Sequence, residues 1–182
     1  MSDYPVLVGD DFHGPCITSY DTIQSIGATF MASNVNASGA TFTWPTANRA
    51  IYVPFVSPVD LVVVKMFVEN GATVNGNVDI GVYDMGGNQV AAAGSTVQAG
   101  TSTIQIIDTA DFTLVAGRYY MALASSSATS TFARSGQPGA AVIGAMGVLQ
   151  QASAFALPAT ATFAANAFTS VPMFGLAMIT GI

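Results

Sequence analysis

The chain has 182 residues, of which 51% are hydrophobic and 8% charged, and its formal net charge is −6. Ordinary globular proteins carry about a quarter charged residues, and disordered chains combine low hydrophobicity with high net charge, so this composition predicts a folded protein with an unusually neutral surface. Only four residues are Lys or Arg, which leaves no basic patch for phosphates and argues against nucleic-acid binding.

Neither a membrane span nor an export signal is predicted. The longest apolar run, residues 139–149, has 11 residues, whereas a spanning helix needs about 20. The first residues, MSDYPVLVGDDFHGP, carry acids where a signal peptide begins with basic side chains. The single cysteine, Cys16, cannot form an intramolecular disulfide, which suits synthesis in a reducing cytoplasm.

Residues 1–47 predict an N-terminal arm or a few short strands, because short apolar groups alternate there with Thr, Ser, Gly and Asn. From residue 48 onward the pattern is that of a β-domain. RAIYVPFVS (49–57) is typical of a strand, in which Pro54 favours an edge or a bulge. DLVVVKMFVEN (60–70) is a β-branched run long enough for a core strand.

A β-hairpin is predicted next. DIGVYD (79–84) alternates with period two, so Ile80 and Tyr83 face opposite sides of the strand. The tip, DMGGN, supplies residues that tolerate positive φ, and we expect Gly86 or Gly87 to use it. QVAAAGS then forms the returning strand.

Three further strand patterns follow: TSTIQIID (101–108), RYYMALASS (118–126) and TSTFARSG (129–136). Asp108 and Asp111 are expected to flank a turn. Turn signals recur every 8–12 residues without a convincing helical stripe, which is typical of a β-sandwich or barrel.

The last 48 residues, 135–182, contain no charged side chain. Their first half predicts loop and irregular strand, and VPMFGLAMITGI predicts a terminal strand that closes the sandwich. Interface cores are depleted of charge and enriched in aromatic residues, so residues 137–168 are expected to help bury a homo-oligomeric contact, with a trimer as the first choice. The contact residues of this hypothesis are Phe155, Leu157, Phe163 and Phe168. The alternative is that the segment packs on its own domain.

One cluster near the N-terminus has metal-ligand residue types. Asp10, Asp11 and His13 could form a metal or acid–base site, but a polar turn in which the aspartates accept backbone hydrogen bonds is the favoured interpretation. Cys16 with His13 could act as a thiol and its base. A buried, unreactive cysteine is favoured instead.

Other candidate groups also favour structure over chemistry. Asp79 and Asp84 would lie on opposite faces of one strand, about 16 Å apart, so Asp84 is expected to accept hydrogen bonds in the turn and Asp79 to be a solvated edge. Trp44, Tyr83, Tyr119 and Tyr120 could stack on sugars, but packing in the core or an interface is the favoured use. No phosphate loop, zinc spacing or nucleophile elbow is present, so we predict no catalytic residue, cofactor or metal.

Residues 49–134 resemble a jelly-roll module of tailed-phage structural proteins. The resemblance is carried by RAIYVPFVSPVDLVVVKMFVENGATVNGNVDIGVYDMGGNQV and by ADFTLVAGRYYMALASSSATSTFAR. It covers about half of the chain and rests on hydrophobic pattern and turn spacing. It implies an all-β, antiparallel β-sandwich of jelly-roll type over residues 48–182, with the N-terminal arm before it and the charge-free insertion at about 137–168.

The resemblance also implies a non-enzymatic virion protein that is made in the host cytoplasm. A capsid decoration protein of a tailed phage is the leading hypothesis, with the major capsid protein or other virion proteins as partners and contact with neither nucleic acid nor membrane. The N-terminal arm would reach a neighbouring protein. A tail-borne receptor- or carbohydrate-binding domain is the alternative, and a secreted carbohydrate-binding module is a third hypothesis.

Overall fold

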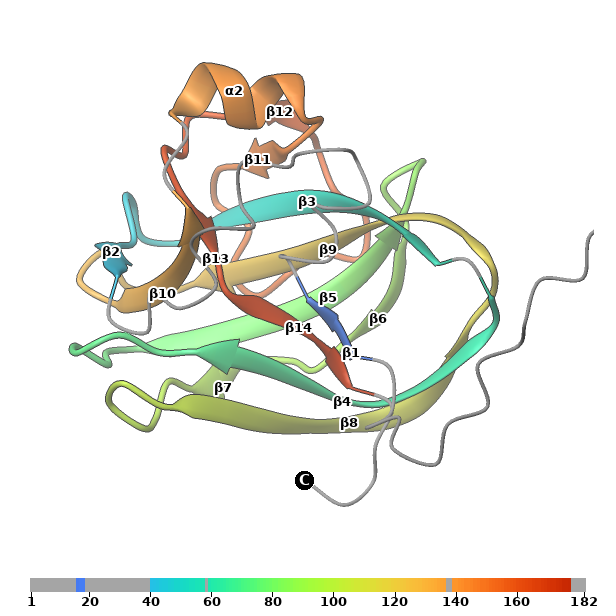
Figure 1. Cartoon of the computed structure of the whole chain (residues 1–182), viewed down its shortest axis with the longest axis horizontal. Coiled ribbons are helices and arrows are strands. Elements are labelled where there is room, and N and C mark those ends of the chain that lie inside the picture. Colours follow the sequence, from blue (N-terminus) through green and yellow to red (C-terminus); the bar gives the residue numbers. More distant parts are fainter. Residues whose placement is uncertain (1–15, 19–39, 58, 137–138, 178–182) are drawn as a thin grey trace, which may run out of the picture.

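A computed structural model describes residues 16–18, 40–57, 59–136 and 139–177 of the chain. Within these ranges the strands pair antiparallel and pack as a sandwich (Figure 1), which confirms the predicted all-β, antiparallel β-sandwich. The strands are β1 (Cys16–Thr18), β2 (Thr41–Thr43), β3 (Arg49–Ser57), β4 (Leu61–Glu69), β5 (Asn77–Asp84), β6 (Gln89–Ala92), β7 (Thr96–Val97), β8 (Ile104–Leu114), β9 (Gly117–Ser125), β10 (Thr131–Gly136), β11 (Leu149–Gln151), β12 (Ala164–Ala165), β13 (Val171–Pro172) and β14 (Phe174–Ala177). One short helix, α2 (Ala140–Ala145), precedes β11.

The first sheet has the strand order β12-β11-β3-β9-β5-β6, and β7 also pairs with β5. Strand β3 pairs with β9 along its whole length, from Arg49 opposite Ser125 to Ser57 opposite Gly117. On its other side β3 pairs with β11 only through residues 50–52. Pro54 therefore lies where the described residues provide a neighbouring strand on one side alone, which suits a residue without an N–H group.

The second sheet has the order β1-β14-β4-β8. The predicted core strand β4 lies between β14 and β8, and the predicted terminal strand β14 pairs with β4 on one side and with β1 on the other. The turn predicted between Asp108 and Asp111 is wrong, because both residues belong to the continuous strand β8. The pairing of β4 with β8 shifts register between Val63 and Lys65. This β-bulge interrupts the ladder locally, and both strands continue beyond it.

Trp44 lies at the centre of an aromatic group at one end of the main core. Its ring packs edge-on against Phe132 (5.1 Å between centroids) and Phe168 (5.0 Å). The neighbouring strand β2 pairs with β10, which also pairs with β13. Residues 41–44 of the predicted N-terminal segment are therefore part of the sandwich itself.

The predicted β5–β6 hairpin is present, and its tip uses positive φ. The Gly87 N–H donates to the Asp84 carbonyl (3.1 Å), the Asp84 N–H donates to the Asn88 carbonyl (2.9 Å), and Gly87 has φ 86°. Ile80 lies in the main core, while Tyr83 lies on the opposite face, as the alternation predicts.

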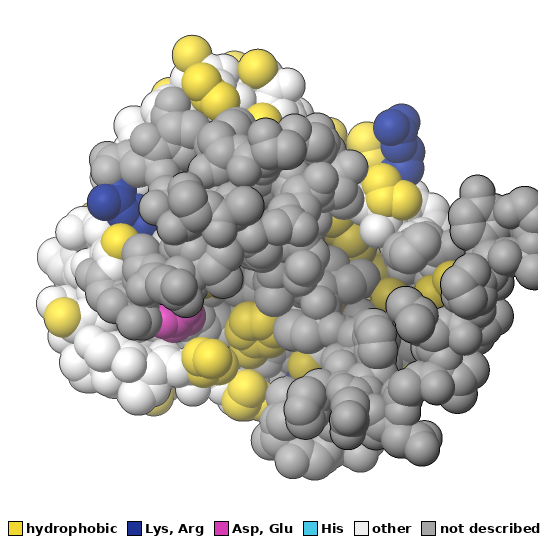
Figure 2. All heavy atoms as spheres, in the orientation of Figure 1, with side chains coloured by type: hydrophobic (Ala, Val, Ile, Leu, Met, Phe, Trp, Pro, Cys, Tyr) yellow, Lys and Arg dark blue, Asp and Glu magenta, His cyan; other side chains and the backbone are white. Residues whose placement is uncertain are grey.

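Helix α2 was not predicted from the sequence. The helix has six residues, AAVIGA, and buries only Ile143. So short a segment cannot show the repeat of apolar residues by which a helix is recognised in a sequence. Val142 is 42% exposed, and Figure 2 shows hydrophobic side chains gathered at the top of the molecule, over this helix.

Replacing Gly87 with alanine should destabilise the fold by about 1–2 kcal/mol, since a side chain is strained at positive φ. Its Cβ would also lie 3.0 Å from the Ala161 carbonyl oxygen. Gly86→Ala is the matched control, because no positive φ is found there and the nearest atoms belong to the side chains of Asp84 and Asn88. Thermal unfolding followed by circular dichroism would compare the two, and equal melting temperatures would contradict this account of the turn.

Candidate functional site

The centre of the first sheet is buried on both faces. One face packs on the main core, and the other carries a second apolar cluster, which we call the outer cluster. It consists of Ala50, Tyr52, Tyr83, Tyr120, Ala122, Ala124, Ala154 and Leu157, with Leu149, Phe155, Ala161 and Phe163 packed against it. Strands β3, β5 and β9 supply one half of this cluster, and residues 149–163 supply the other half. These last residues, which we call the cover segment, therefore shield the outer face of the sheet.

The cover segment is joined to the hairpin tip by backbone hydrogen bonds. The Ala161 N–H donates to the Gly87 carbonyl (2.8 Å), and the Gln89 N–H donates to the Ala159 carbonyl (2.9 Å). Gly81 on β5 makes room for the segment, because a Cβ there would lie 3.0 Å from Leu157 Cδ1. The hairpin thus supports the cover segment as well as connecting two strands.

Two tyrosines lie beneath the cover segment and are fully buried. Their rings meet edge-on at 5.3 Å. The Tyr52 hydroxyl donates to Gln151 Oε1 (2.9 Å), and the Tyr83 hydroxyl donates to the Pro158 carbonyl (2.6 Å). Burial raises the pKa of Tyr52 well above its ordinary value, and burial together with the nearby Asp79 charge raises that of Tyr83 to about 12. Both phenols therefore stay neutral and act as hydrogen-bonding core residues.

Asp79 is not the solvated edge that the sequence suggested. It is 1% exposed and lies beneath the cover segment, where the Leu157 N–H donates to its Oδ2 (2.9 Å). Its Oδ1 is buried without a hydrogen-bond partner. Burial raises the pKa of this carboxyl, and the hydrogen bond from Leu157 offsets only part of that effect.

Asp84 accepts hydrogen bonds in the turn, as predicted. The Asn88 backbone N–H donates to its Oδ1 (2.8 Å) and the Asn88 side chain to its Oδ2 (2.9 Å). These bonds hold the pKa of Asp84 below its ordinary value. The two carboxylates that the sequence placed on opposite faces thus have opposite environments.

Two of the four predicted contact residues, Leu157 and Phe168, are buried within their own domain. Phe168 (2% exposed) belongs to the main core and Leu157 (7%) to the outer cluster, so neither side chain is available to a second copy of the chain. Phe163 stacks on Tyr52 (5.1 Å) and Tyr120 (4.8 Å), and Phe155 is also partly buried against the outer cluster. Packing on the chain's own fold, the alternative that the sequence left open, thus accounts for Leu157 and Phe168. A contact of Phe155 and Phe163 with a second copy stays a prediction.

Tyr119 and Tyr120 point to opposite faces of β9, as expected from their adjacency. Tyr119 packs against Phe55 (5.8 Å), and its hydroxyl donates to the Val115 carbonyl (2.8 Å). Tyr120 is 8% exposed. Packing, which the sequence favoured for these aromatics, accounts for both rings.

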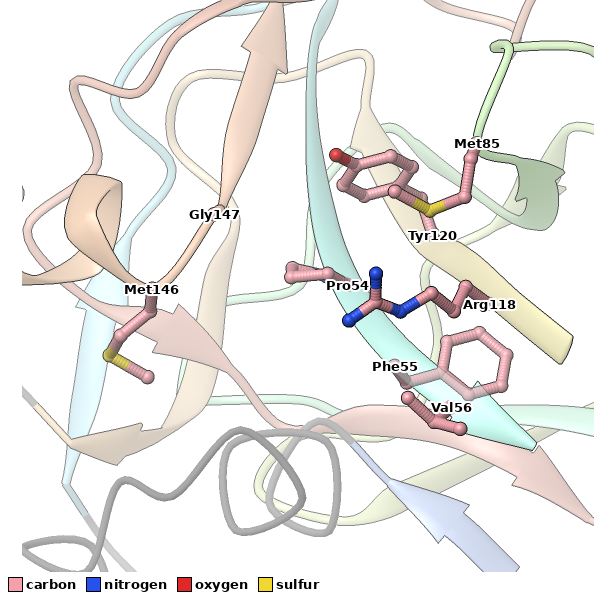
Figure 3. Close-up of a pocket in the computed structure, with 8 residues that line it drawn as sticks. All are labelled: Pro54, Phe55, Val56, Met85, Arg118, Tyr120, Met146 and Gly147. Carbon is pink, nitrogen blue, oxygen red and sulfur yellow. The ribbon is translucent and has the colours of Figure 1, made fainter. Parts of the chain in front are cut away.

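An open hollow lies beside the cover segment, on the same outer face (Figure 3). Its floor is formed by two neighbouring pairs across β3 and β9, Pro54 opposite Tyr120 and Val56 opposite Arg118. Met85 from the hairpin tip and residues 146–147, just after α2, form its two sides, and its volume is about 240 Å³. This hollow is the candidate binding site of the described part of the chain.

The groups near the N-terminus are not tested by the structure. Asp10, Asp11 and His13 lie outside the described residues, and Cys16 is described only through the pairing of β1, opposite Ala177. Among the residues that are described, no group of three or more His, Cys, Asp or Glu side chains could hold a metal ion. No helix in the same ranges is both long and apolar enough to cross a membrane.

Comparison with protein-family models found no match, and a search of curated proteins found none either.

At neutral pH, Asp79→Asn should raise the free energy of unfolding, whereas Asp84→Asn should lower it, and both effects should shrink in acid. The folded-state pKa of Asp79 is raised, so the folded chain binds a proton that the unfolded chain releases, and its ionised form costs stability above that pKa. Asparagine can still accept the Leu157 N–H without that charge. Asp79→Asn should therefore be most favourable, relative to wild type, near neutral pH, and this advantage should shrink as the pH falls through the folded pKa.

The pKa of Asp84 is lowered, so its ionised form contributes stability that is present above the unfolded value of about 3.8 and lost as the pH falls through the folded pKa. Asp84→Asn should accordingly be unfavourable at neutral pH and approach neutrality in acid. Urea unfolding of both variants between pH 3 and 7 would measure this. The same pH trend in both variants would contradict the raised pKa of Asp79.

Proposed function

We propose that this chain is a non-enzymatic structural protein of a virion, and that it decorates the capsid of a tailed phage. The proposal combines the resemblance of residues 49–134 with one feature of the sandwich, its long open edge. The resemblance also implies the jelly-roll strand order, which stays a prediction beyond the antiparallel sandwich itself.

The observation that supports the proposal is the unpaired edge of strand β8. The strand has 11 residues and pairs only with β4 among the described strands, so its other edge presents N–H and C=O groups to a neighbour. Ile104 is 59% exposed and Ile106 is 39% exposed. Soluble proteins usually protect such an edge, because a long apolar edge strand pairs readily with another chain.

The acidic residues of β8 divide the strand into two parts. Asp108 and Asp111 lie in its centre and its second half and oppose pairing there, since inward or edge charges are a common protection. The first part, around Ile104 and Ile106, has no charged residue. We infer that this part forms a contact between copies of the chain, which the buried Leu157 and Phe168 cannot provide.

Ile104→Lys with Ile106→Lys should reduce self-association and leave the sandwich folded, because both side chains are exposed on an edge strand. Light scattering after size exclusion would measure mass, and circular dichroism would verify the fold. Val142→Lys on α2 is the matched control, since it adds a charge at a side chain that is 42% exposed and lies within residues 137–168. A wild-type monomer at all concentrations, or dissociation by the control alone, would contradict the β8 contact.

The virion role has its own test. Quantitative mass spectrometry of purified virions should find the protein at a copy number comparable with that of the major capsid protein. A few copies per particle would favour the alternative, a tail-borne receptor- or carbohydrate-binding domain, for which the open hollow at Arg118 is the supporting feature. Absence from virions would overturn both.

A further inference from the structure

Arg118 is an exposed cation without a partner in the described part of the chain. The protein has 10 acidic residues and four Lys or Arg residues, so a cation has many potential partners. Lys65 and Arg134 each take part in an interaction. No hydrogen bond or ion pair joins Arg118 to a described residue, and its guanidinium lies over Pro54, at the floor of the hollow (Figure 3).

A second polar group lies on the same floor. Tyr120 is two residues from Arg118 on β9, so both side chains leave the strand on the outer face. The Tyr120 ring is held by its stacking on Phe163 at 4.8 Å, while its hydroxyl has no hydrogen-bond partner among the described residues. The hollow therefore offers a fork of guanidinium N–H donors and, next to it, one hydroxyl on a fixed ring.

The rest of the hollow is apolar. Met85 lies beside the Tyr120 ring on one side, and Pro54 and Val56 complete the floor, whereas the Met146 side chain packs against the main core. Methionine side chains adapt to the shape of a ligand. A volume of about 240 Å³ is below the ~300–1,000 Å³ of typical drug-sized sites, so the ligand would be small.

We propose that the hollow binds a small organic monocarboxylate with a compact apolar body. The carboxylate accepts hydrogen bonds from the Arg118 guanidinium and the Tyr120 hydroxyl, and the body packs against Met85 and Pro54. A guanidinium matches a carboxylate through two parallel hydrogen bonds. One cation balances one negative charge, whereas a phosphate dianion would leave a net negative charge against apolar walls in a chain that is already acidic. This ligand site is independent of the proposed virion role.

Phenylacetate is the probe for this site, and NMR titration of the full chain is the measurement. Phenylacetate should bind saturably and shift resonances of residues 54–56, 85, 118–120 and 146–147. Acetate, which lacks the apolar body, and 2-phenylethanol, which lacks the charge, should each bind at least 10-fold more weakly. Removal of the charged hydrogen bonds in Arg118→Met should weaken binding by about 10- to 100-fold, and Tyr120→Phe, which keeps the ring stacked on Phe163, by about 2- to 10-fold.

Lys65→Met is the control for net charge, because it removes one cation from the other sheet. It should leave phenylacetate binding unchanged, with circular dichroism verifying the fold of every variant. Equal weakening by Lys65→Met, equal binding of 2-phenylethanol, or resonance shifts outside the hollow would overturn the proposal. Inorganic phosphate binding as tightly as phenylacetate would overturn the carboxylate class. Absence of probe binding, together with loss of self-association in Arg118→Met, would assign the hollow to a neighbouring subunit instead.

Discussion

Leu157, Phe163 and Ala154 pack onto the outer face of β3, β9 and β5, and the rest of the structure depends on this contact. A sandwich normally leaves the outer face of each sheet to water, so its strands alternate apolar and polar side chains. Here the cover segment takes the place of water over the centre of the first sheet. Strands β5 and β9 can therefore carry apolar side chains on both faces, and residues 78–83 and 120–125 are buried without interruption.

This second burial explains the polar groups that lie beneath it. Tyr52 and Tyr83 point away from the main core, yet they are buried because the cover segment provides hydrogen-bond acceptors, Gln151 Oε1 and the Pro158 carbonyl. Asp79 is also buried beneath the cover segment, but its hydrogen bonding is less complete. Its Oδ2 accepts a hydrogen bond from the Leu157 N–H, and its Oδ1 has no partner. A half-satisfied buried carboxylate is costly, and here it lies at the joint between the sheet and its cover.

The two surfaces with a proposed role lie outside the area that the cover segment shields. The hollow around Arg118 begins beyond the end of β11, where β3 is no longer paired on that side and Pro54 is left at the edge. Strand β8 is the edge of the other sheet and carries its exposed isoleucines on a surface that no described strand covers. The proposed contact between copies and the proposed ligand site are therefore separate, one on each sheet.

The sequence by itself determined the strands, since period-two alternation and turn residues act within a few neighbours. Residues 49–57 are a strand with the predicted bounds, Ile80 and Tyr83 face opposite sides, and Gly87 adopts the positive φ that the hairpin tip requires. Tertiary structure decided what lies over each face. Asp79 is exposed or buried according to the position of Leu157, 78 residues later. The charge-free segment would have the same sequence pattern whether it covers its own sheet or a second copy. Hydrophobic burial has no direction, so composition shows that a surface is covered while only the fold shows by what.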